Sequence, residues 1–245
     1  MIRTTFLLYF LTSFPLMAAT LHLESGAQQN TLVELYTSEG CSSCPPAEEY
    51  LNKFKKSSDL WKKIIPVAFH VNYWDYLGWQ DRYAHPSFGQ RQSQYAKLKR
   101  VSTVYTPAFI VNGEGWRPGF FSGDISGRSH KSGKLVVEIK GNMLRAKFSP
   151  TIVKSRPLTL NVAILGMGIS DIIEKGENEG RTAQHEFVVV GFNRQGSENA
   201  NWKMTLPKQH YQKVKEHAIA VWVSTKDNPT PLQAVGGSLS LAKDF

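Results

Sequence analysis

Two patterns of apolar and polar residues divide this chain. Between residues 30 and 123, short apolar runs alternate with segments whose apolar positions recur at helical spacing. This half predicts strands and helices, with strands at 31–36, 64–71 and 107–113 and helices at 47–54 and 87–101. Strands that alternate with helices indicate an α/β half, in which helices cover a central sheet.

From residue 134 to 245 the pattern changes to one strand after another. Apolar runs separated by turn signals at 141–142, 176–180, 196 and 227–231 predict six strands, at 134–141, 143–150, 158–168, 185–193, 202–207 and 218–225. Short strands separated by such turn signals are typical of an antiparallel sandwich or meander. A stretch rich in Gly and Ser precedes them, and we expect residues 124–133 to be a connector.

The first 19 residues have the pattern of a targeting segment. Arg3 is followed by an apolar run from Phe6, and small residues close the segment at Ala18 and Ala19. This order predicts a secretory signal cleaved near Ala19, with an uncleaved anchor as the alternative. We therefore expect an exported protein, periplasmic or secreted, with no stable membrane insertion after cleavage.

Composition and charge exclude one class of partner. Hydrophobic residues make up 41% of the chain, which is enough for a sizeable core. The formal net charge is +9, but Lys and Arg are scattered and form no basic stripe or known nucleic-acid module. We expect no nucleic-acid partner.

The two cysteines of the chain, Cys41 and Cys44, lie in the segment GCSSCPP. As a structural staple the pair is poor, because a bridge around so short a loop contributes only about 2 kcal/mol. As a zinc clip it supplies two ligands of the four that a closed site needs, although His70, Asp75 and His85 could add to them. As a redox pair it is well placed, since one thiolate can attack and the other resolve the mixed disulfide.

The position of the pair supports redox chemistry. It follows a predicted strand and precedes a predicted helix, whose free N–H groups and dipole would lower the pKa of the Cys41 thiol. Pro45 and Pro46 are compatible with the first turn of a helix, where N–H groups have no intrahelical partner. We expect regular helix from about Pro46 or Ala47.

Two motifs resemble a known active site. LYTSEGCSSC (35–44) is similar to the active-site strand and loop of glutaredoxins and the wider thioredoxin superfamily, and VYTPAFIV (104–111) is similar to its cis-proline loop. The resemblance implies a cis bond at Thr106-Pro107, with both residues positioning the substrate. It also places Glu34 near the position where thioredoxins carry a buried acid that handles protons. The alternative for Glu34 is an ordinary edge or surface carboxylate.

A narrower resemblance covers most of the mature chain. The segments GCSSCPPAE, AFHVNYWDYLGW, VYTPAFIVNG and GENEGRT are similar to an exported bacterial family known as domain of unknown function 1223. That resemblance implies an α/β thioredoxin-like domain with a helical insertion over 30–123, followed by an all-β sandwich-like domain over 134–245. It implies no established substrate.

Other polar residues are weaker candidates. Seven polar and aromatic residues of the segment 70–81 could form a substrate wall beside Cys41: His70, Asn72, Tyr73, Trp74, Asp75, Trp79 and Asp81. The structural alternatives are a core histidine at His70 and a turn-capping aspartate at Asp75, and Tyr76 and Leu77 are expected to pack. GENEGRT (176–182) could be a charged loop that approaches the site or a hairpin turn with a Glu-Arg pair, and the hairpin turn is the preferred interpretation. Arg181 and His185 are minor candidates.

The sequence thus predicts an exported thiol–disulfide oxidoreductase. Cys41 would attack a protein or small-molecule thiol or disulfide substrate, and Cys44 would resolve the intermediate, with no cofactor and no resident metal. Two alternatives stay open at this point: a copper- or zinc-handling protein that uses Cys41, Cys44 and His70, and a binding module with a non-catalytic cysteine pair.

Overall fold

The computed structural model describes residues 20–117, 125, 130–152 and 157–239. The predicted signal segment, residues 1–19, lies outside the described residues, as does part of the predicted connector. The described residues contain two α-helices and two short 3₁₀ helices: α1 (Pro45–Asn52), α2 (Pro86–Lys97), η1 (Lys53–Lys56) and η2 (Asp75–Leu77). No helix in these described ranges is both long and apolar enough to cross a membrane.

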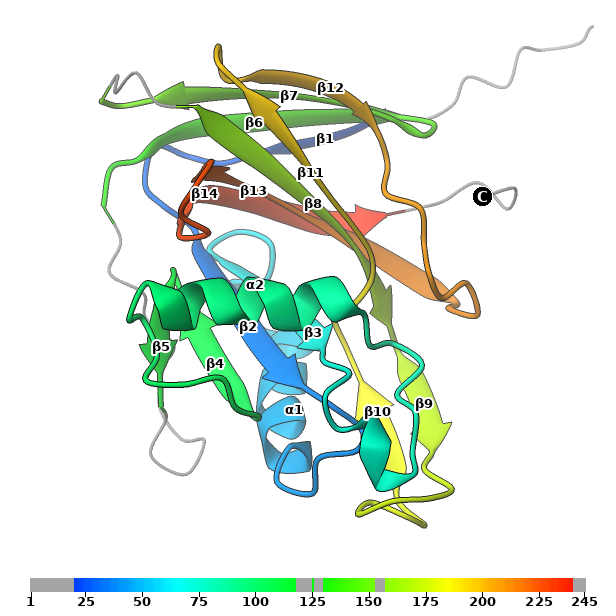
Figure 1. Cartoon of the computed structure of the whole chain (residues 1–245). Coiled ribbons are helices and arrows are strands. Elements are labelled where there is room, and N and C mark those ends of the chain that lie inside the picture. Colours follow the sequence, from blue (N-terminus) through cyan, green and yellow to red (C-terminus); the bar gives the residue numbers. More distant parts are fainter. Residues whose placement is uncertain (1–19, 118–124, 126–129, 153–156, 240–245) are drawn as a thin grey trace, which may run out of the picture.

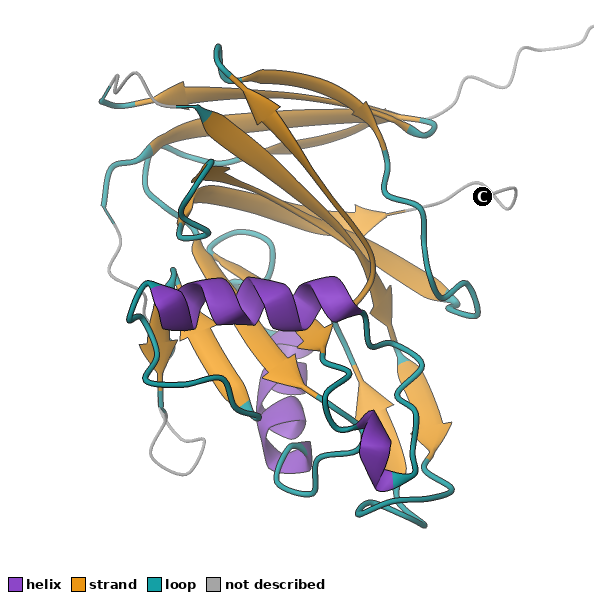
Figure 2. Ribbon diagram, viewed as in Figure 1, coloured by secondary structure: helices purple, strands orange, loops and turns teal. Residues whose placement is uncertain are grey.

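The described strands form one large sheet, one smaller sheet and a hairpin (Figures 1 and 2). The large sheet has the order β14 (Pro231–Leu239), β13 (Glu216–Thr225), β8 (Leu158–Met167), β11 (Val188–Ser197), β3 (Ile64–His70), β2 (Thr31–Thr37), β4 (Ala108–Val111), β5 (Glu114–Trp116). The smaller sheet has the order β1 (Thr20–Glu24), β6 (Gly133–Lys140), β7 (Met143–Pro150), β12 (Asn201–Thr205). The hairpin pairs β9 (Ile169–Ile172) with β10 (Thr182–His185).

The predicted fold class, an α/β thioredoxin-like domain followed by an all-β sandwich-like domain, is wrong. Strands hold 47% of the described residues and helices 13%, so the protein is mainly β-sheet. The physical reason lies in one pairing: β11 runs parallel to β3, and Ala68 N–H donates to Phe187 O at 2.8 Å. Strands from both halves of the chain therefore share one eight-stranded sheet.

Strand β8 shows why the shared sheet is stable. Its residues Leu160, Val162 and Ile164 face the smaller sheet, whereas Ala163 and Leu165 belong to the core on the other face. Both faces are thus buried, which explains a continuous apolar run rather than an alternating one. β1 was not predicted; it pairs with β6 and brings the start of the described chain into the smaller sheet.

The two helices cover opposite faces of the large sheet near β2. Glu34 and Tyr36 of β2 lie on the face of α2, while Thr37 contacts Glu48 of α1. α1 starts at Pro45, slightly before the expected Pro46 or Ala47. The expected Asn-Gly turn is confirmed, because Asn112 and Gly113 take positive φ angles of 48° and 84° between β4 and β5. α2 ends before the predicted residue 101, and Lys99 beyond it takes a φ of 57°.

Candidate functional site

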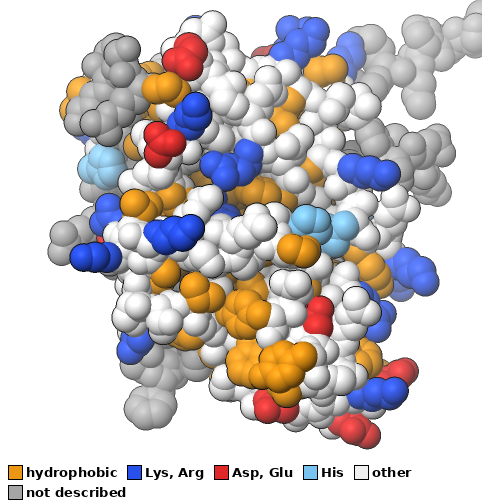
Figure 3. Space-filling view, in the orientation of Figure 1, with side chains coloured by type: hydrophobic (Ala, Val, Ile, Leu, Met, Phe, Trp, Pro, Cys, Tyr) orange, Lys and Arg blue, Asp and Glu red, His pale blue; other side chains and the backbone are white. Residues whose placement is uncertain are grey.

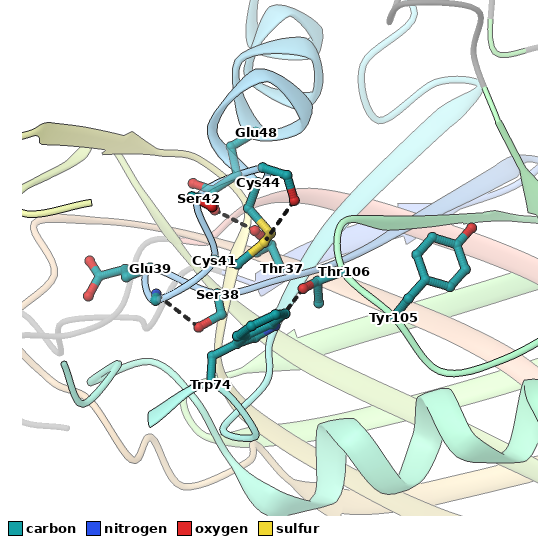
Figure 4. Close-up of a disulfide and its surroundings, with 12 residues drawn as sticks. Thr37, Ser38, Glu39, Cys41, Ser42, Cys44, Glu48, Trp74, Tyr105 and Thr106 are labelled. Atoms are coloured by element: carbon teal, nitrogen blue, oxygen red, sulfur yellow. Dashed lines mark hydrogen bonds between the residues drawn. A yellow bond between two sulfur atoms is a disulfide. The ribbon is translucent and has the colours of Figure 1, made fainter. Parts of the chain in front are cut away.

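Residues 38–44, here called the cysteine loop, connect β2 to α1. Cys41 and Cys44 form a disulfide with a Cα–Cα distance of 5.4 Å (Figure 4). Cys44 N–H donates to Cys41 O at 3.1 Å, and Cys41 N–H donates to Ser38 O at 3.1 Å. The loop is therefore a pair of tight turns that delivers the bridge to the beginning of α1.

The start of α1 differs from the expectation in one respect. Pro45 and Pro46 have no N–H, and the next two N–H groups, of Ala47 and Glu48, both donate to Cys44 O. The helix thus offers Cys41 its dipole rather than a free N–H donor. The polar neighbour of the Cys41 sulfur is the Ser43 hydroxyl, with Sγ and Oγ 3.4 Å apart.

Both cysteines are buried, although Ser42 and Ser43 between them are exposed. Cys41 is 1% exposed and Cys44 is 0% exposed, so the structure does not show Cys41 as an accessible residue. Two segments far away in sequence cover the loop: the residues after β3, which include Trp74, and the β9–β10 turn, which contains GENEGRT.

The GENEGRT segment approaches the cysteine loop directly. The Asn178 amide is buried and donates to two backbone oxygens of the loop, Glu39 O at 2.8 Å and Cys41 O at 3.0 Å. Glu177 accepts from the Ser42 N–H at 3.3 Å. The interpretation of this segment as a mere hairpin turn is therefore too simple, because the turn also fixes the cysteine loop.

Trp74 and Thr106 lie together beside the disulfide (Figure 4). Trp74 Nε1–H donates to Thr106 Oγ1 at 2.6 Å, and a Cβ on Gly40 would lie 3.2 Å from Trp74 Cβ. The Thr106-Pro107 bond is cis, as the motif implied. Because Ala108 pairs with Tyr36, the preceding residues Thr106 and Pro107 lie alongside the end of β2, just before the cysteine loop.

Other predicted residues have structural partners. Asp75 begins η2 and accepts from Asp81 N–H at 3.3 Å, which fits the turn-capping alternative. His85 accepts from Ser87 N–H and caps α2.

Tyr76 is 76% exposed, so its predicted packing role is wrong. Figure 3 shows apolar side chains gathered on the surface below α2.

Glu34 is buried, which excludes an edge or surface carboxylate. It accepts two hydrogen bonds from Arg91 of α2, at 2.8 and 2.9 Å, and others from Tyr36 and Tyr95. This ion pair lies on the α2 face of the sheet, whereas the disulfide precedes α1. Burial lowers the pKa of Arg91, but the Glu34 carboxylate together with Tyr95 and Tyr36 more than offsets it, so this pKa lies above its ordinary value.

A second charged cluster lies beneath α1. Glu48 accepts from the Thr37 hydroxyl at 2.5 Å and is 2.5 Å from His185 Nδ1, while His185 Nε2 is 3.2 Å from Glu39. Burial lowers the pKa of His185, but the two carboxylates more than offset it, so this pKa lies well above its ordinary value. His185 is thereby held as a cation between two buried acids.

His70 and Asp81 extend this cluster. Asp81 accepts from His70 Nδ1–H at 2.7 Å and from Glu39 N–H at 2.9 Å. Burial raises the pKa of Asp81, but His70 and these hydrogen bonds more than offset it, so this pKa lies below its ordinary value. The rings of His70 and His185 are 5.2 Å apart. Sequence reasoning found His70 but missed Glu39 and Glu48, although Glu48 follows Cys44 by one helical turn.

Comparisons with known proteins identify a family and a fold. A search of curated proteins finds no match. Protein AGR_C_4864 from Agrobacterium tumefaciens has a similar structure, with a TM-score of 0.57, 20% identity, and coverage of 88% of this chain and 95% of that one. HBP35 of Porphyromonas gingivalis is similar with a TM-score of 0.56, 14% identity, and coverage of 90% and 79%. At these identities the likeness concerns the fold alone. The family described as a protein of unknown function (DUF1223) matches residues 32–224, so the chain belongs to that family.

Proposed function

We propose that this protein is a thiol–disulfide oxidoreductase that acts through Cys41 and Cys44. The observation that carries the proposal is the disulfide itself, which bridges two residues immediately before α1. A bridge that closes so small a loop adds about 2 kcal/mol of stability, so chemistry is the better reason for it. The proposed compartment is the periplasm or the extracellular space, where such pairs are used in oxidised form.

The reaction needs only the two cysteines and a substrate disulfide. In the reduced protein the Cys41 thiolate attacks one substrate sulfur, forms a mixed disulfide and releases the other substrate sulfur as a thiolate. The Cys44 thiolate then attacks Cys41 Sγ, re-forms the Cys41–Cys44 bond and releases the second substrate thiolate. Two electrons pass to the substrate, and the reverse sequence oxidises a substrate dithiol.

Neighbouring residues would support this chemistry. The Ser43 hydroxyl, 3.4 Å from Cys41 Sγ, can donate to the thiolate, and the α1 dipole favours its charge. Thr106 and Pro107 lie alongside the end of β2, where they would align a substrate strand. Protein and small-molecule thiols or disulfides are the proposed substrates.

Trapping tests the proposed roles of the cysteines. We expect Cys44→Ser to accumulate a mixed disulfide at Cys41 with glutathione disulfide or with a protein partner, because the resolving thiol is gone. The adduct is measured by intact mass before and after reduction. Cys41→Ser serves as the matched control and should form much less adduct, because the proposed attacking thiolate, with the Ser43 hydroxyl beside its sulfur, is gone. Equal adducts in both variants, or none in either, would contradict the assignment.

Access to the disulfide should depend on Asn178. Its two hydrogen bonds hold the β9–β10 turn against the cysteine loop, and each such bond is worth about 1 kcal/mol. Asn178→Ala should therefore speed reduction by dithiothreitol about tenfold, since about 1.4 kcal/mol corresponds to that factor. The rate is followed by alkylating the released thiols. Asn142→Ala, in an exposed turn, should leave it unchanged; an unchanged rate in Asn178→Ala would show that another group controls access.

A further inference from the structure

The buried cluster beneath α1 contains three groups that converge on one point. One ligand atom from each of Glu48, His70 and His185 lies within 4.8 Å of the other two. All three side chains are buried, and they come from α1, β3 and β10. Their convergence therefore depends on the folded sheet rather than on one local motif.

His70 has a free nitrogen that the ion pairs do not explain. Its Nδ1 is occupied by Asp81 at 2.7 Å, whereas Nε2 is buried and has no hydrogen-bond partner among the described residues. An unsatisfied buried polar atom costs about 1–3 kcal/mol, so it calls for a ligand. A histidine whose other nitrogen is bonded to a carboxylate is the usual arrangement of a metal-bound imidazole.

The other two groups have the same supporting arrangement. His185 offers Nδ1 to the cluster while its Nε2 is held by Glu39 at 3.2 Å. Glu48 offers one oxygen while the other accepts from the Thr37 hydroxyl at 2.5 Å. Each of the three groups is thus oriented by a partner outside the cluster, as ligands of metal sites are.

We propose that Glu48, His70 and His185 form a binding site for a divalent transition metal of the zinc type. Two histidines and one glutamate are the protein ligands of a known class of zinc site, in which a water or substrate takes the fourth position. At zinc–ligand distances of about 2.0–2.1 Å, tetrahedral ligands lie about 3.3 Å apart, so His185 and Glu48 would separate slightly and His70 would approach.

A pocket reaches two of the three groups, Glu48 and His185, but not His70. It has a cavity volume of about 110 Å³ and is lined by residues of the cysteine loop, α1 and β10, including Glu39, Glu48 and His185. That volume exceeds the roughly 10–15 Å³ that a water molecule requires, so water has room beside Glu48 and His185. The proposed site is separate from Cys41 and Cys44, which are bonded to each other and offer no thiolate in this state.

The experiment uses the full mature protein with its disulfide intact, freed of metal by a chelator, and Zn²⁺ or Co²⁺ as the probe. We expect one Zn²⁺ per chain by native mass spectrometry, and a rise in Tm of about 5–10 °C when Zn²⁺ exceeds its Kd a hundredfold. Co²⁺ should give the visible absorption of a tetrahedral site, and Zn²⁺ should displace it.

His70→Asn is the decisive variant. The asparagine amide can replace Nδ1–H toward Asp81 but supplies nothing at the position of Nε2, so the chain should fold while its Zn²⁺ affinity falls at least a hundredfold. His217→Asn, at a half-buried histidine on β13 outside the cluster, is the matched control and should bind normally.

A double variant separates this site from the cysteines. Cys41→Ser with Cys44→Ser should bind Zn²⁺ as well as the parent protein does. The proposal is overturned if the parent binds no Zn²⁺, if folded His70→Asn binds it equally well, or if binding disappears with the cysteines.

Discussion

Replacing Glu34 by glutamine should lower the free energy of unfolding by about 3–5 kcal/mol. The side chains of Glu34 and Arg91 are 1% and 2% exposed, and the two form a bidentate ion pair between β2 and α2. Glutamine keeps the shape, but its single carbonyl oxygen can accept from only one of the Tyr36 and Tyr95 hydroxyls, which donate to different oxygens of Glu34. It also leaves the Arg91 charge buried without a counter-charge. Urea-induced unfolding followed by tryptophan fluorescence measures the loss.

An exposed glutamate and a second substitution provide the controls. Glu138→Gln changes a side chain that is 56% exposed and should alter stability by less than about 0.5 kcal/mol. Combining Glu34→Gln with Arg91→Met removes both charges, and the double variant should be more stable than Glu34→Gln alone. A loss below about 1 kcal/mol in Glu34→Gln would mean that Arg91 reaches water and that the pair is not an anchor of α2.

Local sequence signals predicted most elements well. The apolar runs at 64–71 and 158–168 correspond to β3 and β8, and Asn112 and Gly113 make the expected turn. The pairing of β11 with β3 could not be predicted, because it joins Val188 to Ala68 across 120 residues without a turn between adjacent strands. Strands buried on both faces also show no alternation that would reveal their neighbours.

The candidate site also has features that the sequence predicts and contacts that it does not. The spacing of Cys41 and Cys44 and the Thr-Pro motif were visible in the sequence, and the bridge and the cis bond are present. Asn178 and His185 reach the site from the β9–β10 hairpin, 137 residues away from Cys41 and from Glu48 respectively. Contacts at such separations depend on how the hairpin packs on α1, which spacing and periodicity do not encode.

His185→Leu should lower the free energy of unfolding of the metal-free protein by about 3–5 kcal/mol. Leucine has a similar size, so the loss comes mainly from Glu39 and Glu48, whose carboxylates are then buried without the histidine cation. Chemical unfolding in the presence of a chelator measures it. His22→Leu, at an exposed histidine of β1, is the control and should change stability little.

A double-mutant cycle separates the pair from the cavity around it. Glu48→Gln removes one of the two acids, so adding it to His185→Leu should cost less than the two single losses combined, with a coupling energy of about 1–3 kcal/mol. Additive losses would mean that His185 and Glu48 do not interact as the 2.5 Å contact indicates.

In the parent protein Zn²⁺ would replace the proton between these groups, so both single variants should also lose the rise in Tm with Zn²⁺. A variant that is destabilised without metal yet still stabilised by Zn²⁺ would retain the ion-pair explanation and remove that residue from the proposed ligand set.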